Sequence, residues 1–287
     1  MKKLFVAVIA LMMTISASAQ FYIYCSDGNV IKVDSISMVA PDSTAGIGVF
    51  SVSADKQVTF SKGNLRYIQP TDTWSFAEDQ YDYLGEANIA IDADVLAYKV
   101  DLFGWSTSAT NFGVSTSEDS NDYSGSFIDW GTNQIGADAP NTWRTLTFDE
   151  WEYLLNNRPN ASSLKGVAQV NGVNGLILLP DNWTCPSDVY FRSGFHSNFG
   201  KNYYAAYQTF TAAEWSKLEA AGAVFLPAAG NRFGSDGDGV QMTGCYWSAT
   251  EVSSYDASCL RFYSAEANMD GDNRYVGHSV RLVKDLQ

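Results

Sequence analysis

Basic residues are scarce in this chain of 287 residues, which has 18 lysines and arginines against 32 aspartates and glutamates. The formal net charge of −14 at pH 7 repels phosphate backbones and anionic membrane surfaces. We therefore expect no nucleic-acid partner, and we assign the acidity to solubility.

Histidine is rarer still, with two copies, His196 and His278, that lie far apart in the sequence. Neither is accompanied by cysteines at the spacing of a zinc site. No Gly-x-Ser-x-Gly elbow occurs, and the glycine-rich stretches do not open helices as phosphate-binding loops do. Because no catalytic set is recognisable, we expect a protein that is not an enzyme.

Long apolar runs are absent except at the N-terminus. Lys2 and Lys3 precede an apolar run over residues 4–15, and Ala17-Ser18-Ala19 resembles a cleavage site. The run is shorter than the roughly 20 residues that span a bilayer. We predict a signal peptide over residues 1–19, with a retained anchor as the alternative. The mature chain is then expected in the periplasm, at the cell surface or secreted, with no transmembrane segment.

Cysteine is limited to Cys25, Cys185, Cys245 and Cys259. Export places them in an oxidising compartment, where a disulfide can persist, and four cysteines allow three complete pairings. Cys245 and Cys259 flank a predicted hairpin and are the first pair to consider, with Cys185 as the alternative partner of either.

Strand alternation argues against the pair Cys245–Cys259. If Trp247 shares a buried face with Leu260 and Phe262, the two cysteines point to opposite faces of the hairpin. We therefore leave the pairing open.

Short strands and turns dominate the first part of the chain. Residues 21–25 and 30–33 predict a small hairpin, and a linker ends the segment 20–45. A single domain is expected over residues 46–287. Residues 85–140 lack periodicity and form an unusually long loop region. Its isolated aromatic residues are expected to hold it against the body of the domain.

Two capped helices are expected, over residues 147–155 and 211–219. In each, a threonine is followed three residues later by a glutamate, Thr147 by Glu150 and Thr211 by Glu214. This is the capping-box pattern, in which hydroxyl and carboxylate satisfy free amide groups reciprocally. Each helix precedes an apolar strand that ends in proline. We predict an α+β fold with two helices packed on short antiparallel sheets and long loops.

The C-terminal half carries a family resemblance. The stretches involved are the Glu-Trp helices, 176–183, Phe225-Leu226-Pro227-Ala228-Ala229-Gly230-Asn231-Arg232, Tyr246-Trp247-Ser248-Ala249-Thr250 and 277–283. They resemble the fibrobacter major paralogous domain, a group of exported bacterial proteins. The resemblance implies a C-type lectin-like fold, which formylglycine-generating enzymes and the variable proteins of diversity-generating retroelements share.

Departures from better-known relatives limit what the resemblance implies. The Glu-Pro-Asn, Gln-Pro-Asp and Trp-Asn-Asp motifs of calcium-dependent sugar-binding lectins are missing. Cys245 and Cys259 lack the surroundings of the reactive cysteines in formylglycine-generating enzymes. We therefore carry neither activity over to this chain.

The loops between residues 231 and 275 are the predicted ligand-binding surface, because aromatic rings beside amides, carboxylates and guanidinium groups suit sugar or protein recognition. The candidate residues are Asn231, Arg232, Asp236, Asp238, Tyr255, Asp270, Asp272, Asn273, Arg274 and Tyr275.

Calcium is a second possibility at two places in these loops, Asp236 with Asp238 and Asp270 with Asp272. Calcium needs six to eight oxygen ligands, and neither stretch has the full spacing with a terminal glutamate. Aspartate and glycine are also the ordinary residues of tight turns. We favour turns and expect no cofactor, with calcium as the alternative.

The sequence thus favours an exported, non-enzymatic binding module that recognises a glycan or a protein surface. The alternatives are a hydrolase acting on polysaccharide, which needs two acids in one cleft, and a structural component of the cell surface.

Overall fold

The computed structural model describes residues 21–24, 30–33, 48–85 and 99–286. The chain divides into two compact units, Met1–Thr44 and Ala45–Gln287. In the first unit, β1 (Phe21–Tyr24) pairs antiparallel with β2 (Val30–Val33), as the predicted hairpin requires. The predicted signal peptide and the linker before the domain lie outside the described residues.

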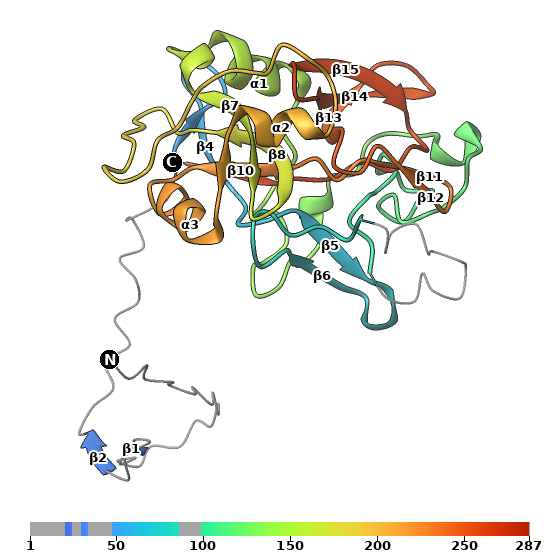
Figure 1. Ribbon diagram of the computed structural model, residues 1–287. Coiled ribbons are helices and arrows are strands. Elements are labelled where there is room, and N and C mark those ends of the chain that lie inside the picture. The colour runs from blue at the N-terminus through green and yellow to red at the C-terminus, as the bar shows by residue number, and fades with distance from the viewer. Residues whose placement is uncertain (1–20, 25–29, 34–47, 86–98, 287) are drawn as a thin grey trace. The chain divides into compact units, whose positions relative to one another are not determined.

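The larger unit is a mixed α+β structure of small, mostly antiparallel sheets, which confirms the predicted class (Figure 1). Its helices are α1 (Phe148–Glu152), α2 (Asn202–Tyr207) and α3 (Ala212–Ala220). Its strands are β3 (Phe50–Ser51), β4 (Gln57–Phe60), β5 (Leu65–Ile68), β6 (Thr73–Phe76), β7 (Lys165–Val170), β8 (Val173–Leu178), β9 (Thr209–Phe210), β10 (Val224–Pro227), β11 (Asn231–Phe233), β12 (Asp236–Asp238), β13 (Gly244–Glu251), β14 (Asp256–Phe262), β15 (Ala267–Asn273) and β16 (Val283–Asp285).

Both predicted capping boxes are present. The Thr147 hydroxyl accepts from the Glu150 amide, while the Glu150 carboxylate accepts from the Thr147 amide at 3.0 Å. Thr211 and Glu214 repeat this arrangement at the start of α3, with the reciprocal bond at 2.8 Å. α1 ends earlier than predicted, because a π-helical turn replaces it over Tyr153–Asn157.

The central sheet has the strand order β10-β8-β7-β9. Its apolar strands separate two hydrophobic clusters, one around Leu176 and Leu226 and one around Ile177 and Phe225. Trp215 of α3 packs in the second cluster and is 1 % exposed. The apolar stripe of this capped helix therefore faces the sheet, as its sequence indicates.

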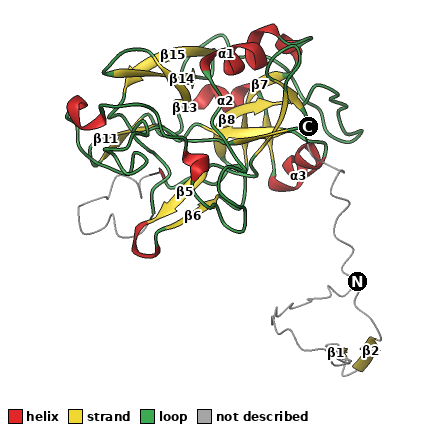
Figure 2. Cartoon of the chain, turned by 180° about the vertical axis from the view of Figure 1, so that it is seen from behind, coloured by secondary structure: helices red, strands yellow, loops and turns green. Residues whose placement is uncertain are grey.

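The two ends of the larger unit meet in one sheet. β16, the last strand, pairs antiparallel with β4, and β3 completes the order β16-β4-β3. Figure 1 shows β4 beside the C-terminus, and Figures 1 and 2 place α1 and the β5–β6 hairpin at opposite ends of this unit. β16 therefore joins residues 283–285 to the N-terminal part of this unit, with Val283 fully buried.

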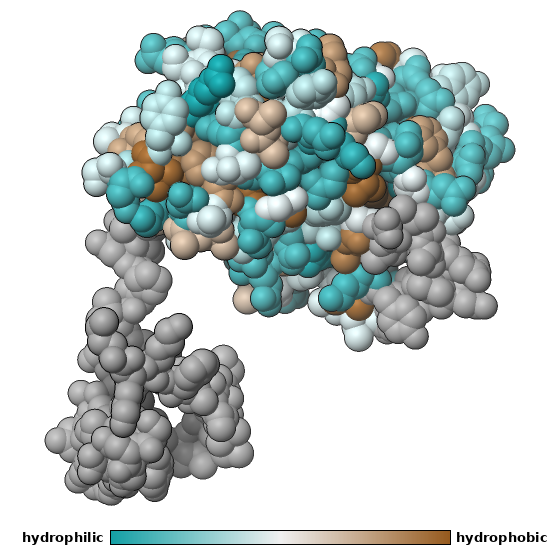
Figure 3. Space-filling model, viewed as in Figure 1, coloured by the Kyte–Doolittle hydropathy of each residue, from teal (hydrophilic) through white to brown (hydrophobic). Residues whose placement is uncertain are grey.

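The irregular segment before α1 is held down by its aromatic residues, as predicted. Phe103, Trp105, Tyr123 and Trp130 are all fully buried. Trp105 Nε1 donates to the carbonyl oxygen of Ser248 at 2.9 Å, which ties the segment to β13. On the face drawn in Figure 3, the surface is mainly hydrophilic and its hydrophobic groups are small and separate.

Candidate functional site

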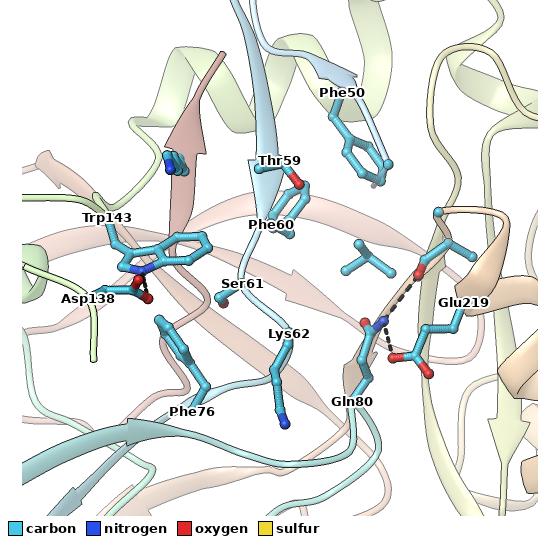
Figure 4. A pocket seen from close by; sticks show the side chains of 15 residues that line it. Phe50, Thr59, Phe60, Ser61, Lys62, Phe76, Gln80, Asp138, Trp143 and Glu219 are labelled. Carbon is cyan, nitrogen blue, oxygen red and sulfur yellow. Dashed lines mark hydrogen bonds between the residues drawn. The ribbon is translucent and has the colours of Figure 1, made fainter. Parts of the chain in front are cut away.

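A groove of about 490 Å³ lies beside the β16-β4-β3 sheet, between the loop that precedes α1 and the C-terminal end of α3. Figure 4 shows four aromatic side chains around it, Phe50, Phe60, Phe76 and Trp143. We call this feature the aromatic groove. Its volume falls within the range of roughly 300–1,000 Å³ that small-molecule sites occupy.

Trp143 and Phe76 form the accessible wall of the aromatic groove. Both are half-buried, and their ring centroids lie 5.2 Å apart in an edge-to-face arrangement. The Trp143 Nε1 group donates to Asp138 Oδ2 at 2.9 Å, which limits rotation of the indole. Phe50 and Phe60 are almost fully buried and form the floor. The groove therefore presents an oriented indole beside a carboxylate.

The opposite wall is built around Gln80, which is 5 % exposed and makes four hydrogen bonds. Its carbonyl oxygen accepts from the Phe225 amide at 2.7 Å and from Arg281 Nη2 at 3.1 Å. Its amide nitrogen donates to Glu219 Oε1 at 2.8 Å and to the Ala223 carbonyl at 3.1 Å. Gln80 thus fixes one oxygen of Glu219, and within the described residues the other oxygen has no hydrogen-bond partner.

The prediction that Arg232 and Arg274 are exposed is wrong. Their side chains are 0 % and 1 % exposed. Arg232 donates to the carbonyl oxygens of Leu102 and Ser115, each at 3.1 Å. Arg274 donates to the carbonyl oxygen of Gly125 at 3.1 Å. The guanidinium groups that we expected to face a ligand thus donate to backbone carbonyl oxygens of the segment before α1.

Asp270 and Asp272 of β15 face Arg261 of β14. The ion-pair distances are 2.9 Å from Arg261 Nη1 to Asp270 Oδ2 and 2.6 Å from Nη2 to Asp272 Oδ2. Asp272 Oδ2 also lies 3.2 Å from Nε2 of the fully buried His278. Burial raises the pKa of Asp272, but the His278 contact and neighbouring donors more than offset it and hold that pKa below its usual value.

Other predicted residues are accessible but scattered. Asn231 and Asp238 are a cross-strand pair of the β11–β12 hairpin, and Asp236 lies at its turn. Tyr255 is 54 % exposed in the turn before β14. Two more residues are half-buried, Asn273 and Tyr275. Among the predicted residues, the structure brings together Asn231 with Asp238 and the ion-paired Asp270 with Asp272. The Arg274 amide also donates to the Tyr255 carbonyl oxygen at 2.9 Å, and the Asn273 amide donates to Asp272 Oδ1 at 2.8 Å.

No group of three or more histidine, cysteine, aspartate or glutamate residues in the described part of the chain is arranged to hold a metal ion. Asp270 and Asp272 already face a guanidinium group. The calcium alternative therefore gains no support from the geometry around these two residues.

Comparison with protein families, with curated proteins and with solved structures finds no match for this chain. No helix within residues 48–85 and 99–286 is long and apolar enough to cross a membrane.

Three cysteines are free thiols, Cys185, Cys245 and Cys259, and Cys25 lies outside the described residues. The prediction that Trp247 shares a face with Leu260 is wrong, because Trp247 pairs with Cys259 and Tyr246 pairs with Leu260. Trp247 thus lies on the opposite face from Leu260. Cys245, two residues before Trp247, consequently shares a face with Cys259.

No local sequence pattern marks the residues of the aromatic groove. They come from distant segments, with Phe60 on β4, Phe76 on β6 and Trp143 before α1. Trp143 was not distinguishable from the buried tryptophans of the same region by its neighbours in sequence. The tertiary fold brings these segments to one place, with β4 paired to β16 and Arg144 bridged to Val283.

Proposed function

We propose that the protein is an exported, non-enzymatic binding module that recognises a glycan in the aromatic groove. The observation that carries this proposal is the Trp143–Phe76 pair, with Trp143 held by Asp138 at the mouth of a groove. Sugar rings have apolar C–H faces and polar edges. An oriented indole offers stacking area, and a neighbouring carboxylate accepts hydroxyl hydrogen bonds.

The aromatic groove is a better ligand site than the loops 231–275. Two of the predicted residues there, Arg232 and Arg274, are buried by backbone contacts, and Asp270 and Asp272 are ion-paired with Arg261. A ligand would have to displace these partners. In the groove, by contrast, Trp143 is already half-exposed and one oxygen of Glu219 is open.

The scaffold that we propose for this module is C-type lectin-like. The pairing of β4, near the start of the larger unit, with its last strand β16 supports it, because this pairing brings the two ends of a loop-rich domain together. Helices α1 and α3, each with a capping box, and the short antiparallel sheets further support it.

The test is a glycan array followed by titration calorimetry, on the full chain without residues 1–19. Replacing Trp143 by alanine should weaken binding by about tenfold or more, since that loss corresponds to about 1.4 kcal/mol of stacking and hydrogen bonding. Trp183→Ala is the matched control, because Trp183 is also half-buried but packs on Phe191 away from the groove. Thermal melting checks that both variants fold.

Two results would overturn the proposal. The first is a Trp143→Ala variant that folds and binds every glycan as tightly as the original protein. The second is a folded protein that binds no saccharide at all on the array.

A hydrolase is the second candidate, because Asp138 and Glu219 stand on opposite walls of the groove (Figure 4). Paired carboxylates across a cleft are the minimum for glycoside hydrolysis. Incubating the protein with each oligosaccharide that binds separates the two functions. Shortened products that disappear with Asp138→Asn or Glu219→Gln would assign an enzyme, whereas unchanged oligosaccharide supports a binding module.

A further inference from the structure

Two lysines line the aromatic groove of a protein that is otherwise acidic. Lys62 follows β4, and Lys284 lies on β16 directly across from Thr59, which also lines the groove. Among the described residues, no carboxylate lies within 4.0 Å of either ammonium group. Lys56 and Lys217, by comparison, each have a carboxylate partner.

The carboxylates at the groove do not neutralise these lysines by direct pairing. One oxygen of Asp138 accepts from Trp143 Nε1, and one oxygen of Glu219 accepts from Gln80 Nε2. Figure 4 shows Lys62 between the wall formed by Phe76 and the wall formed by Gln80. The groove therefore combines an aromatic face, hydroxyl acceptors and unpaired ammonium groups.

A sugar acid matches all three features at once. Its ring has an apolar face for Trp143, hydroxyl groups that can donate to Glu219, and a carboxylate that an ammonium group attracts. A neutral sugar would leave Lys62 and Lys284 without a partner. A ligand with negative charge but no ring would leave the aromatic wall unused.

From this combination we infer that the glycan is acidic and that Lys62 and Lys284 bind carboxylates of its uronic acid units. This inference rests on the proposed function. Gln80 contributes by holding Glu219 in place, so the hydroxyl acceptor is fixed before the ligand arrives and little ordering is needed on binding.

The test compares each uronate oligomer with its own uncharged methyl ester, using oligomers of galacturonate, guluronate and glucuronate. At low salt, at least one acid should bind about tenfold or more tightly than its ester, and this preference should shrink as salt screens the charges. The double variant Lys62→Gln, Lys284→Gln should bind acid and ester alike. Lys201→Gln is the control, because Lys201 is an exposed lysine that does not line the aromatic groove.

The outcomes distinguish a failure of the acidic-ligand inference from a failure of the proposed function. If neutral glycans and esters bind as well as acids, and Trp143→Ala abolishes binding, the acidic ligand is wrong and the binding module stands. If the acid preference survives in the double lysine variant, the assignment of Lys62 and Lys284 is wrong. If no saccharide of either charge binds, the proposed function fails and this inference fails with it.

Discussion

The guanidinium carbon of Arg274 lies 4.4 Å from the centre of the Trp105 ring, although the two residues are far apart in the sequence. The same guanidinium donates to the carbonyl oxygens of Tyr123 and Gly125, at 3.3 and 3.1 Å. It also pairs with Glu251 at 3.0 Å. One buried side chain thus attaches the irregular segment before α1 to the three-stranded sheet β13-β14-β15.

Arg274→Met should destabilise the larger unit, because it removes a buried cation and leaves several carbonyl groups without donors. We expect a loss of about 2–4 kcal/mol in the free energy of unfolding, measured by urea denaturation. Limited proteolysis should show earlier cutting between residues 105 and 130. Arg192→Met is the control, because Arg192 is exposed and stacks on the Tyr207 ring at 4.1 Å. Equal losses for the two variants would refute the attachment role.

Local hydrogen-bond patterns were readable from the sequence. A threonine followed three residues later by a glutamate identified both capping boxes, because donor and acceptor belong to one helical turn. The β1–β2 hairpin is likewise local, because its two strands are close neighbours in the chain. Such features depend on neighbours in the chain and on little else.

Side-chain placement was harder to predict where partners are remote. Arg232 and Arg274 follow or sit beside loops, which suggested exposure, but carbonyl groups of residues 102–125 bury them. The face of Trp247 depended on which residue of β14 it opposes, and a register irregularity follows it in β13. The aromatic groove needs residues from distant segments, such as Phe60, Trp143 and Glu219, to meet, so no local pattern marks it.

Glu150 provides a test of pH dependence. Burial raises its pKa, but hydrogen bonds from Arg144, the Thr147 amide and Lys56 more than offset this and hold the pKa below its ordinary value of 4.5. Because the unfolded chain binds the proton more readily, this stabilisation is complete above that value and is lost as the pH falls through the folded-state pKa. Glu150→Gln should therefore lower the free energy of unfolding by about 1–3 kcal/mol at pH 7. Below pH 7, the stability of this variant should depend less on pH than that of the original protein.

The second capping box supplies the control for Glu150. Glu214→Gln changes the same position of α3, but Glu214 is exposed and its cap involves only Thr211. Between neutral and acidic pH, Glu214→Gln should change the free energy of unfolding less than Glu150→Gln does. If both variants lose equal stability with the same pH profile, the Arg144 and Lys56 contacts contribute nothing and the prediction is wrong.

Gly113 and Gly136 form a matched pair for backbone strain. Both have positive φ, +78° and +58°, but a Cβ at Gly113 would lie 1.8 Å from the Gly104 carbonyl oxygen, whereas nothing lies within 4 Å at Gly136. Gly136→Ala should cost about 1 kcal/mol from backbone conformation alone. Gly113→Ala should cost about 3 kcal/mol or more, because the backbone must also move. Urea denaturation of the two variants compares the costs, and equal losses would contradict the close approach.

The thiols should differ sharply in reactivity. Burial raises the pKa of Cys245 to about 12 and that of Cys259 well above its usual value, whereas Cys185 is exposed. At pH 8 a thiol of pKa near 12 is ionised in only about one molecule in ten thousand, and the thiolate is the reacting form. In a Cys25→Ser background, iodoacetamide should label Cys185 within the time that leaves the other two untouched, and all three should react after unfolding. Mass spectrometry of peptides measures this, and native labelling of Cys245 or Cys259 at the rate of Cys185 would show that the sheet does not bury them.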